Sequence, residues 1–280
     1  MKSVFDPIQY KITTKANWNT VASEYHYNWA DQQVGPFKST AELVKIAEIK
    51  PDDKILDVAC GTGVVSKEIS QFLGRKGLLI GIDLSRTALE IAKRSITFPN
   101  VNFVEMDAEN IGFNFKFDKV TCQYGLMFFP DSGKVLKSIY KNLNSNGKLV
   151  VAVHGLAQDV PYFSIIMNPI LKHVPDIRAD GTPTVHRFGN PDELKSELSK
   201  AGFSDITVTK HEFVYEPGTF EQYWGDYIRT TANIIRTKIE SMDGDIMSKI
   251  KQDARKNALE YENNGKLVLP WTILIASGFN

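Results

Sequence analysis

Two acidic residues and a glycine-rich loop carry the clearest chemical signal in this 280-residue chain. Asp57 lies in the apolar run that begins at Ile55, and the loop 59–63, Ala-Cys-Gly-Thr-Gly, follows it. Asp83 ends a second apolar run, twenty residues after Gly63. Glycines let a backbone turn sharply and let a ligand approach it closely. An acidic residue at this offset can accept hydrogen bonds from both hydroxyls of a ribose. The spacing therefore predicts a nucleoside cofactor across the ends of two strands.

The residues around the loop distinguish between classes of nucleoside-containing cofactor. A dinucleotide fingerprint requires a third glycine three positions after the second, and Ser66 stands there. A P-loop would end in Gly-Lys-Ser or Gly-Lys-Thr, and this loop does not. The segment instead resembles motif I of the class I S-adenosylmethionine-dependent methyltransferases, which Asp57, Gly61 and Gly63 match residue by residue. The alternative interpretation is a plain glycine turn between a strand and a helix.

The resemblance implies S-adenosylmethionine as cofactor and S-adenosylhomocysteine as its product. It implies an acidic residue near the amino group of the methionine moiety, and an open backbone for close approach of that moiety. It also implies a carboxylate at the ribose and, after residues 101–107, an acidic residue and a small residue at the adenine. In this order, the residues that we expect at the cofactor are Asp57, Ala59, Gly61, Gly63, Asp83, Leu84, Asp107 and Ala108.

Alternating strand and helix patterns must position these residues. Residues 117–124 and 148–154 read as strands, and residues 85–95 and 132–143 as helices, with Ser85 as an N-cap. Nearly continuous apolar strands alternating with helices predict a parallel sheet that is covered on both faces. Ligands of such sheets bind at the carboxyl ends of the strands. These ends carry the polar residues Asp57, Asp83, Asp107 and Gln123, so we expect all four at the cofactor.

The resemblance also implies the fold class: α/β, with a Rossmann-like sheet of seven strands in the order 3-2-1-4-5-7-6 and strand 7 antiparallel. Helix 191–201, with Asn190 as N-cap, and the strands 206–215 and 267–277 complete this fold. The expected organisation is an N-terminal lid in 1–50, a cofactor-binding core in 51–155, substrate-cap insertions in 156–188 and 217–265, and the remainder of the sheet in 189–216 and 266–280.

Within the family, the chain is most similar to the branch of the ubiquinone/menaquinone-biosynthesis C-methyltransferases. The similarity rests on residues 18–22 (Trp-Asn-Thr-Val-Ala), 58–63 (Val-Ala-Cys-Gly-Thr-Gly) and 125–131 (Gly-Leu-Met-Phe-Phe-Pro-Asp). The C-terminal half departs from that branch, which puts a quinone as the acceptor in doubt. We expect a small, partly apolar acceptor that is methylated at carbon or oxygen. The alternatives are an NAD(P)-dependent oxidoreductase and a non-catalytic S-adenosylmethionine-binding protein.

Composition limits the partners. The chain has 33 basic and 33 acidic residues, so its formal charge is zero and nucleic acid is not an expected partner. No run approaches the ~20 apolar residues of a membrane span, and the first residues lack the apolar core of a signal peptide. The expected location is the cytoplasm. Cys60 and Cys122 are expected to be small buried residues, and no metal site is expected. The chain could form a homodimer.

Aromatic residues outside the strands are candidates for contact with the cofactor or the acceptor. An amphipathic stripe of Trp18, Val21, Ala22, Tyr25 and Trp29 predicts a helix. This helix either packs on the sheet or closes over the cofactor with Tyr10, Trp18 or Tyr25, of which we expect Trp18 in contact with the cofactor. The two insertions carry further aromatic residues, most of which we expect in the core and a few at a pocket.

The catalytic candidates lie at the ends of two strands. His154 ends the fifth strand and is the candidate general base, because imidazole titrates in the useful range. Its alternative is a structural role. Tyr124, beside Gln123, is a second catalytic candidate that could orient the acceptor. The residues that could bind an anionic or carbonyl acceptor are His173, His186 and Arg187.

Overall fold

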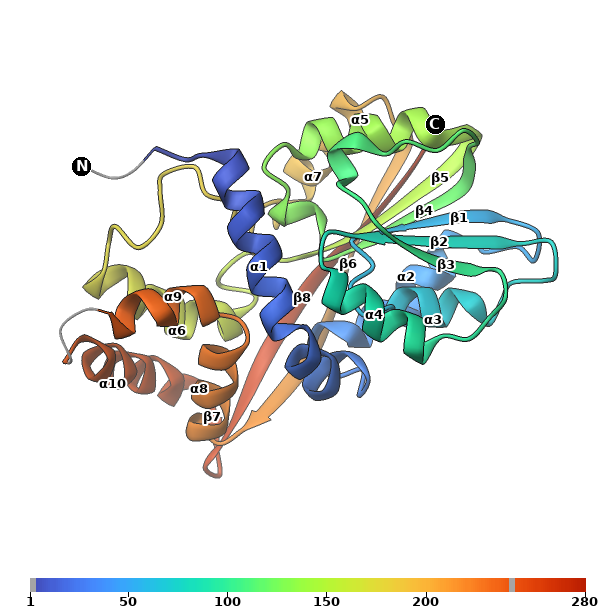
Figure 1. Cartoon of the computed structure of the whole chain (residues 1–280). Helices are drawn as coiled ribbons and strands as arrows, with labels where there is room; N and C mark the ends of the chain where they lie inside the picture. The colour runs from blue at the N-terminus through green and yellow to red at the C-terminus, as the bar shows by residue number, and fades with distance from the viewer. Residues whose placement is uncertain (1–3, 242–244) are drawn as a thin grey trace.

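A mixed β-sheet forms the centre of the protein (Figure 1), whose computed structural model describes residues 4–241 and 245–280. Its strands lie in the order β3-β2-β1-β4-β5-β8-β6, and β7 pairs with β8. The pairs of β8 with β5, β6 and β7 are antiparallel, and the other pairs are parallel. The predicted Rossmann-like α/β fold is confirmed, with the antiparallel strand inserted where it was expected. The two-residue strand β7 was not predicted.

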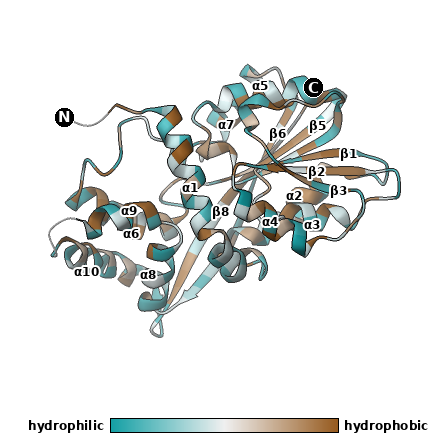
Figure 2. Cartoon of the chain, viewed as in Figure 1, coloured by the Kyte–Doolittle hydropathy of each residue, from teal (hydrophilic) through white to brown (hydrophobic). Residues whose placement is uncertain are grey.

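The central strands are mostly apolar, as Figure 2 shows by their hydrophobic colouring. They are also almost wholly buried. The bounds of the strands are β1 Lys54–Val58, β2 Leu78–Asp83, β3 Val101–Glu105, β4 Phe117–Gln123, β5 Leu143–His154, β6 Ser204–Gly218, β7 Glu262–Asn263 and β8 Lys266–Phe279. Strand β5 begins five residues earlier than expected. The strand includes Asn146 and Gly147, where its register with β4 shifts and Asn146 has a φ of 63°.

Helices cover both faces of the sheet (Figure 1). Their bounds are α1 Pro7–Tyr25, α2 Thr40–Ala47, α3 Val64–Ser70, α4 Arg86–Ser95, α5 Ser132–Asn142, α6 Pro161–His173, α7 Pro191–Lys200, α8 Phe220–Arg229, α9 Asn233–Glu240 and α10 Ile246–Ala258. Helices α2, α3 and α4 lie on one face, and α5 and α7 on the other. The expected N-caps at Ser85 and Asn190 both accept hydrogen bonds from the first turn of their helices.

Strands β6 and β8 extend beyond the rest of the sheet. Strand β5 ends where His154 pairs with Ile273, whereas β6 and β8 stay paired as far as Gly218 and Leu267. Helices α6, α8, α9 and α10 gather around this extension and form the cap that Figure 1 shows beside the sheet. Pro270 lies in this part of β8, next to the edge that β5 has left, so its missing N–H costs no bond to β5.

Helix α1 crosses between the cap and the sheet (Figure 1). It continues into a π-helix over His26–Ala30, and a 3₁₀ turn over Gly35–Ser39 leads into α2. The chain therefore turns at Gly35-Pro36-Phe37, where glycine and proline interrupt the helix. Helix α1 contacts both α4 of the sheet layer and α9 of the cap, so it is placed to form a wall of any cavity between the two regions.

The cysteines agree with their expected role, because Cys60 and Cys122 are both free and buried. Within 4–241 and 245–280, no group of three or more His, Cys, Asp or Glu side chains is arranged to hold a metal ion. In the same ranges, no helix is both long and apolar enough to cross a membrane.

Candidate active site

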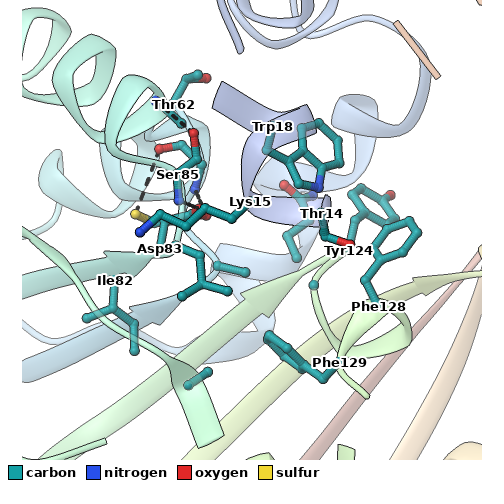
Figure 3. A pocket seen from close by; sticks show the side chains of 18 of the residues that line it. Thr14, Lys15, Trp18, Thr62, Ile82, Asp83, Ser85, Tyr124, Phe128 and Phe129 are labelled. Atoms are coloured by element: carbon teal, nitrogen blue, oxygen red, sulfur yellow. Dashed lines mark hydrogen bonds between the residues drawn. The ribbon is translucent and has the colours of Figure 1, made fainter. Parts of the chain in front are cut away.

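A cavity opens at the carboxyl ends of β1, β2 and β4, where the sequence predicts the cofactor. Figure 3 shows Asp83 and Ser85 from the end of β2 on one side, Tyr124 and Phe128 on the other, and Trp18 of α1 above them. Of the expected cofactor residues, those that line this cavity are Trp18, Asp57, Ala59, Gly61, Asp83, Leu84, Asp107, Ala108 and Gln123. Segments from five parts of the chain therefore meet at one site.

The glycine loop uses backbone conformations that few other residues adopt. Ala59, Gly61 and Gly63 have φ values of 54°, 52° and 89°, all in the left-handed region. A Cβ added to Gly61 would meet no atom within 4 Å, so this residue presents open backbone to the cavity. Gly63 differs, because a Cβ there would lie 2.9 Å from Ile96 Cδ1 and 3.0 Å from Ala92 Cβ. Gly63 does not line the cavity and instead lets α3 pack closely on α4.

Asp57 is buried beneath the loop, with both carboxylate oxygens bonded. Ser66 Oγ donates to Oδ2 at 2.7 Å and Thr121 Oγ1 donates to Oδ1 at 2.9 Å. Burial raises the pKa of Asp57 to about 6, against the effect of these two hydrogen bonds. Ser66, which stands where a dinucleotide fingerprint has glycine, therefore ties the first turn of α3 to β1.

Asp83 connects the loop to the start of α4. Its Oδ2 accepts from the Gly61 N–H at 2.9 Å, and its Oδ1 accepts from the Ser85 N–H at 2.8 Å. Burial raises the pKa of Asp83. Each oxygen keeps further lone pairs, because an ionised carboxylate accepts about four hydrogen bonds. The carboxylate thus holds the Gly61 amide through this hydrogen bond and can still accept from hydroxyl groups in the cavity.

Asp107 and Ala108 follow β3 and form the far wall of the cavity. Asp107 Oδ1 accepts from the Glu109 N–H at 3.0 Å, and Lys11 Nζ of α1 donates to Oδ2 at 2.8 Å. Lys11 also pairs with Glu109 at 2.7 Å. Asp107, the residue expected at the adenine, is therefore also bound by Lys11, which no sequence motif singles out.

Helix α1 closes the cavity from above. Asn19 Oδ1 accepts from Ser85 Oγ at 2.9 Å and from the Thr87 N–H at 3.2 Å, which joins α1 to the start of α4. Lys15 pairs with Glu105 on the surface. The cavity-lining residues of α1 recur at spacings of three and four: Tyr10, Lys11, Thr14, Lys15, Trp18, Ala22 and Tyr25. The predicted aromatic stripe, extended backward at helical spacing, would have found Lys11 and Thr14.

Gln123 ends β4, Tyr124 follows it, and residues 36–40, which lead into α2, fix both side chains. Gln123 Nε2 donates to Ser39 Oγ at 3.0 Å, and Thr40 Oγ1 donates to Gln123 Oε1 at 3.1 Å. The Tyr124 hydroxyl donates to the Pro36 carbonyl at 2.8 Å and lies 2.7 Å from Ser39 Oγ. Tyr124 has a φ of 58°, an unfavourable conformation that directs its ring toward the cavity. Burial raises the pKa of Tyr124, so it remains a neutral phenol.

A second cavity of about 560 Å³ adjoins the first on the cap side. The two cavities share the walls Tyr10, Thr14, Trp18, Tyr25, Tyr124 and Phe128. From the cap insertions, Phe163, Met167 and Tyr227 line it. Most other aromatic residues of the insertions, such as Tyr162 and Tyr223, are fully buried in the core. The expected mixture of core and pocket residues is what the structure shows.

His154 lines this second cavity and not the first. Its ring stacks on Tyr124, with centroids 4.5 Å apart and planes at 10°. Trp271 Nε1–H donates to His154 Nδ1 at 3.2 Å. Burial lowers the pKa of His154 to about 3, so the ring is neutral at neutral pH.

The other three candidates take different places. His186 lines the second cavity, and His173 bonds Asp253 instead, at 2.9 Å. Arg187 donates to the Phe129 carbonyl and to Ser132 Oγ, both at 2.8 Å, so it holds the loop that follows β4.

Comparison with known proteins agrees with this geometry. Residues 49–202, more than half of the chain, match the family described as methyltransferase domain. A ubiquinone/menaquinone biosynthesis C-methyltransferase of Wigglesworthia glossinidia brevipalpis is 33% identical over 114 residues, which span 39% of this chain and 46% of that protein. A demethylmenaquinone methyltransferase of Staphylococcus saprophyticus is 28% identical over 204 residues, 68% of this chain and 82% of the relative.

A solved structure shares the fold. It is phosphoethanolamine N-methyltransferase 2 of Haemonchus contortus in complex with S-adenosylhomocysteine, with a TM-score of 0.60 and 16% identity over 99% of this chain and 60% of that one. Fold and cavity together define a nucleoside-binding α/β protein of the class I methyltransferase type. The chain belongs to the methyltransferase domain family. It is an S-adenosylmethionine-dependent methyltransferase related to the branch that its sequence resembles.

Proposed function

We propose that the protein transfers the methyl group of S-adenosylmethionine to a small, largely apolar molecule bound in the second cavity. The observation that carries this proposal is the common wall of the two cavities, in which Trp18, Tyr124 and Phe128 face both. S-adenosylmethionine supplies an electrophilic methyl group on a sulfonium. Aromatic faces attract such cations, so this wall suits the reacting end of the cofactor.

The cofactor residues divide the binding between them under this proposal. Asp83 accepts from the ribose hydroxyls while it holds the Gly61 amide. Asp107 and Ala108 contact the adenine. Asp57 orders the loop, because its oxygens are bonded to Ser66 and Thr121.

The main contribution of these residues to the rate is to position the acceptor against the methyl group. An acceptor held in line with the sulfonium methyl reacts with an effective concentration far above that in solution. Helix α1 lines both cavities, and residues of the cap line the second. We expect these walls to limit the access of water during this step.

Carbon is the favoured methyl acceptor atom, with oxygen as the second candidate. The two relatives named above are a C-methyltransferase and a demethylmenaquinone methyltransferase, which supports a ring carbon of a quinol-like molecule. The part of the cap formed by α8, α9 and α10 lies beyond the family match. The size of the acceptor is therefore limited by the second cavity of this chain and is not inferred from the relatives.

The balanced charge of 33 basic and 33 acidic residues supports free small molecules over nucleic acids as substrates. We place the reaction in the cytoplasm. A homodimer is compatible with this proposal and is not needed for it, since the residues named above come from one chain.

The test begins with calorimetric titration of the protein with S-adenosylmethionine, S-adenosylhomocysteine and NADH. Binding of the two sulfur nucleosides alone is expected. The protein is then incubated with methyl-labelled S-adenosylmethionine and a panel of hydroquinones, phenols and fatty acids, and products are analysed by mass spectrometry. Transfer of label to a hydroquinone or phenol supports the proposal. Cofactor binding with no transfer to any acceptor would favour the non-catalytic alternative.

A further inference from the structure

Trp271 determines which nitrogen of His154 can meet a ligand. Trp271 Nε1–H donates to His154 Nδ1 at 3.2 Å. An indole nitrogen can only donate, so Nδ1 carries no proton and the neutral ring has its proton on Nε2. Among residues 4–241 and 245–280, none hydrogen-bonds to this Nε2. His154 lines the second cavity, so its N–H is available to an acceptor there.

His186 has the opposite arrangement. Its Nδ1 lies 2.9 Å from the carbonyl oxygen of Gly155. A carbonyl can only accept, so Nδ1 carries the proton and Nε2 has a free lone pair. Burial, joined by the charge of Arg178, lowers the pKa of His186, which keeps this lone pair free at neutral pH. His186 also lines the second cavity.

The two imidazoles lie near each other across one aromatic ring. Phe163 is 4.9 Å from His154 and 5.7 Å from His186, between ring centroids. After burial, the charge of His186 is the second cause that lowers the pKa of His154. The charged residues that line the same cavity are Asp6, Asp176, Arg178 and Lys238. On the two sides of the Phe163 ring, the cavity therefore offers the N–H of His154 and the basic nitrogen of His186.

We propose that His154 and His186 act as a donor–base pair that selects acceptors with a phenol or enol hydroxyl. The acceptor oxygen accepts from His154 Nε2–H, and its proton passes to His186 Nε2. This assignment rests on the proposed function and gives His154 a different role from the general base that the sequence predicts.

The transfer step then balances. The O–H proton moves to His186 Nε2 while a new bond forms between the methyl carbon and the conjugated ring carbon, or that oxygen. The S–CH₃ bond breaks and its electron pair stays on sulfur as neutral S-adenosylhomocysteine. In carbon methylation, the dienone that forms loses its ring proton to solvent and takes up one proton from solvent at oxygen, which restores the phenol. The proton on His186 is released to solvent.

The pair can be tested without turnover, using 4-nitrophenol as the probe. Its phenolate absorbs visible light and its phenol does not, so the bound ionised fraction is measured directly. We expect the protein loaded with S-adenosylhomocysteine to bind it and to raise the phenolate fraction above that in buffer at the same pH. Failure of the wild-type protein to bind the probe, or to raise this fraction, would overturn the proposal.

His186→Asn is the variant that removes the base. Asparagine can keep the hydrogen bond to the Gly155 carbonyl through its amide, but it has no nitrogen at the Nε2 position. We expect the increase in phenolate to fall about tenfold. His211→Asn is the matched control, because His211 lies outside both cavities. Equal phenolate fractions in His186→Asn and wild type would overturn the role of His186.

His154→Gln and His154→Met separate donation from packing. Glutamine can place an N–H near the original Nε2, whereas methionine has a similar size and no donor. We expect probe affinity to drop about tenfold in His154→Met and to be largely kept in His154→Gln. Thermal midpoints of all variants report folding. Equal affinity in wild type and a folded His154→Met would overturn the role of His154.

The outcomes also separate this inference from the proposed function. If the probe binds and ionises as expected, but no acceptor is methylated, the proposed function fails and the donor–base pair stands. If phenols are methylated at unchanged rates by folded His154→Met and His186→Asn, the proposed function stands and the donor–base pair fails.

Discussion

The first cavity, which we propose for the cofactor, and the second cavity, which we propose for the acceptor, are built in different ways. They are called the cofactor cavity and the acceptor cavity below. The cofactor cavity uses backbone amides and carboxylates at strand ends, each within a few residues of a turn, such as Gly61 and Asp83. The acceptor cavity is formed by side chains from distant segments. One of its walls is Trp29, which packs against the rings of Tyr162, Tyr215 and Trp271 behind it. The family match covers most of the first region and ends before α8 to α10 of the second. The first cavity thus depends on local backbone geometry, whereas the second depends on contacts between distant segments.

The aromatic packing of the acceptor side should give the largest effect. Trp29 is buried, and its Nε1–H donates to Asp226 Oδ2 at 3.0 Å. We expect Trp29→Ala to lower the free energy of unfolding by about 3–5 kcal/mol, because it leaves a cavity where four segments meet. Denaturant titration measures this change. Phe72→Ala, at a half-exposed ring, is the control and should change little. A loss for Trp29→Ala as small as that of the control would contradict this view of the acceptor side.

Burial of Asp57 should make stability depend on pH. Its pKa is raised from 3.8 in the unfolded chain to about 6 in the fold, so the folded state binds more protons between these values. Its contribution is fully present below pH 3.8 and is lost as pH rises through about 6, a difference of about 3 kcal/mol. Asp57→Asn should remove this fall. Unfolding free energies of both proteins from pH 4 to 7 test it, and parallel curves would be the contrary result.

The carboxylate of Asp83 should control cofactor affinity more than folding. We expect Asp83→Asn to weaken S-adenosylmethionine binding by about 1.5–3 kcal/mol, the range for hydrogen bonds to a charged group. Calorimetric titration measures this. Asp118→Asn is a matched control, because Asp118 accepts from the Lys54 N–H at 2.8 Å at the opposite edge of the sheet. Equal affinities in the two variants would remove Asp83 from the cofactor site.

The surface contact of α1 should give the smallest effect. Lys15 pairs with Glu105, and both side chains are about 40% exposed. We expect Lys15→Ala to lower the free energy of unfolding by about 1 kcal/mol or less, with the difference shrinking as salt is added. Denaturant titrations at low and high salt measure it. A large, salt-independent loss would mean that α1 is held to the sheet mainly through this lysine.

The sequence by itself determined the cofactor side. The turn at 59–63 and the strand ends at Asp83, Asp107 and Gln123 are local patterns, because strand period and backbone conformation depend on neighbouring residues. Parallel strands bring their carboxyl ends to one edge, so the residues meet without further information. Gly63 shows the limit of this reasoning: the motif includes it, but its missing Cβ serves the packing of α3 on α4.

Only the tertiary structure decided the acceptor side. The tautomer of His154 depends on Trp271, 117 residues away, and the tautomer of His186 on the Gly155 carbonyl. Lys11 reaches Asp107 because α1 folds back across the sheet. These contacts join residues that have no shared period or spacing, and burial then sets their pKa values. Local sequence patterns do not predict such long-range pairs. The tautomers and hydrogen bonds of the acceptor cavity are therefore known only from the folded structure.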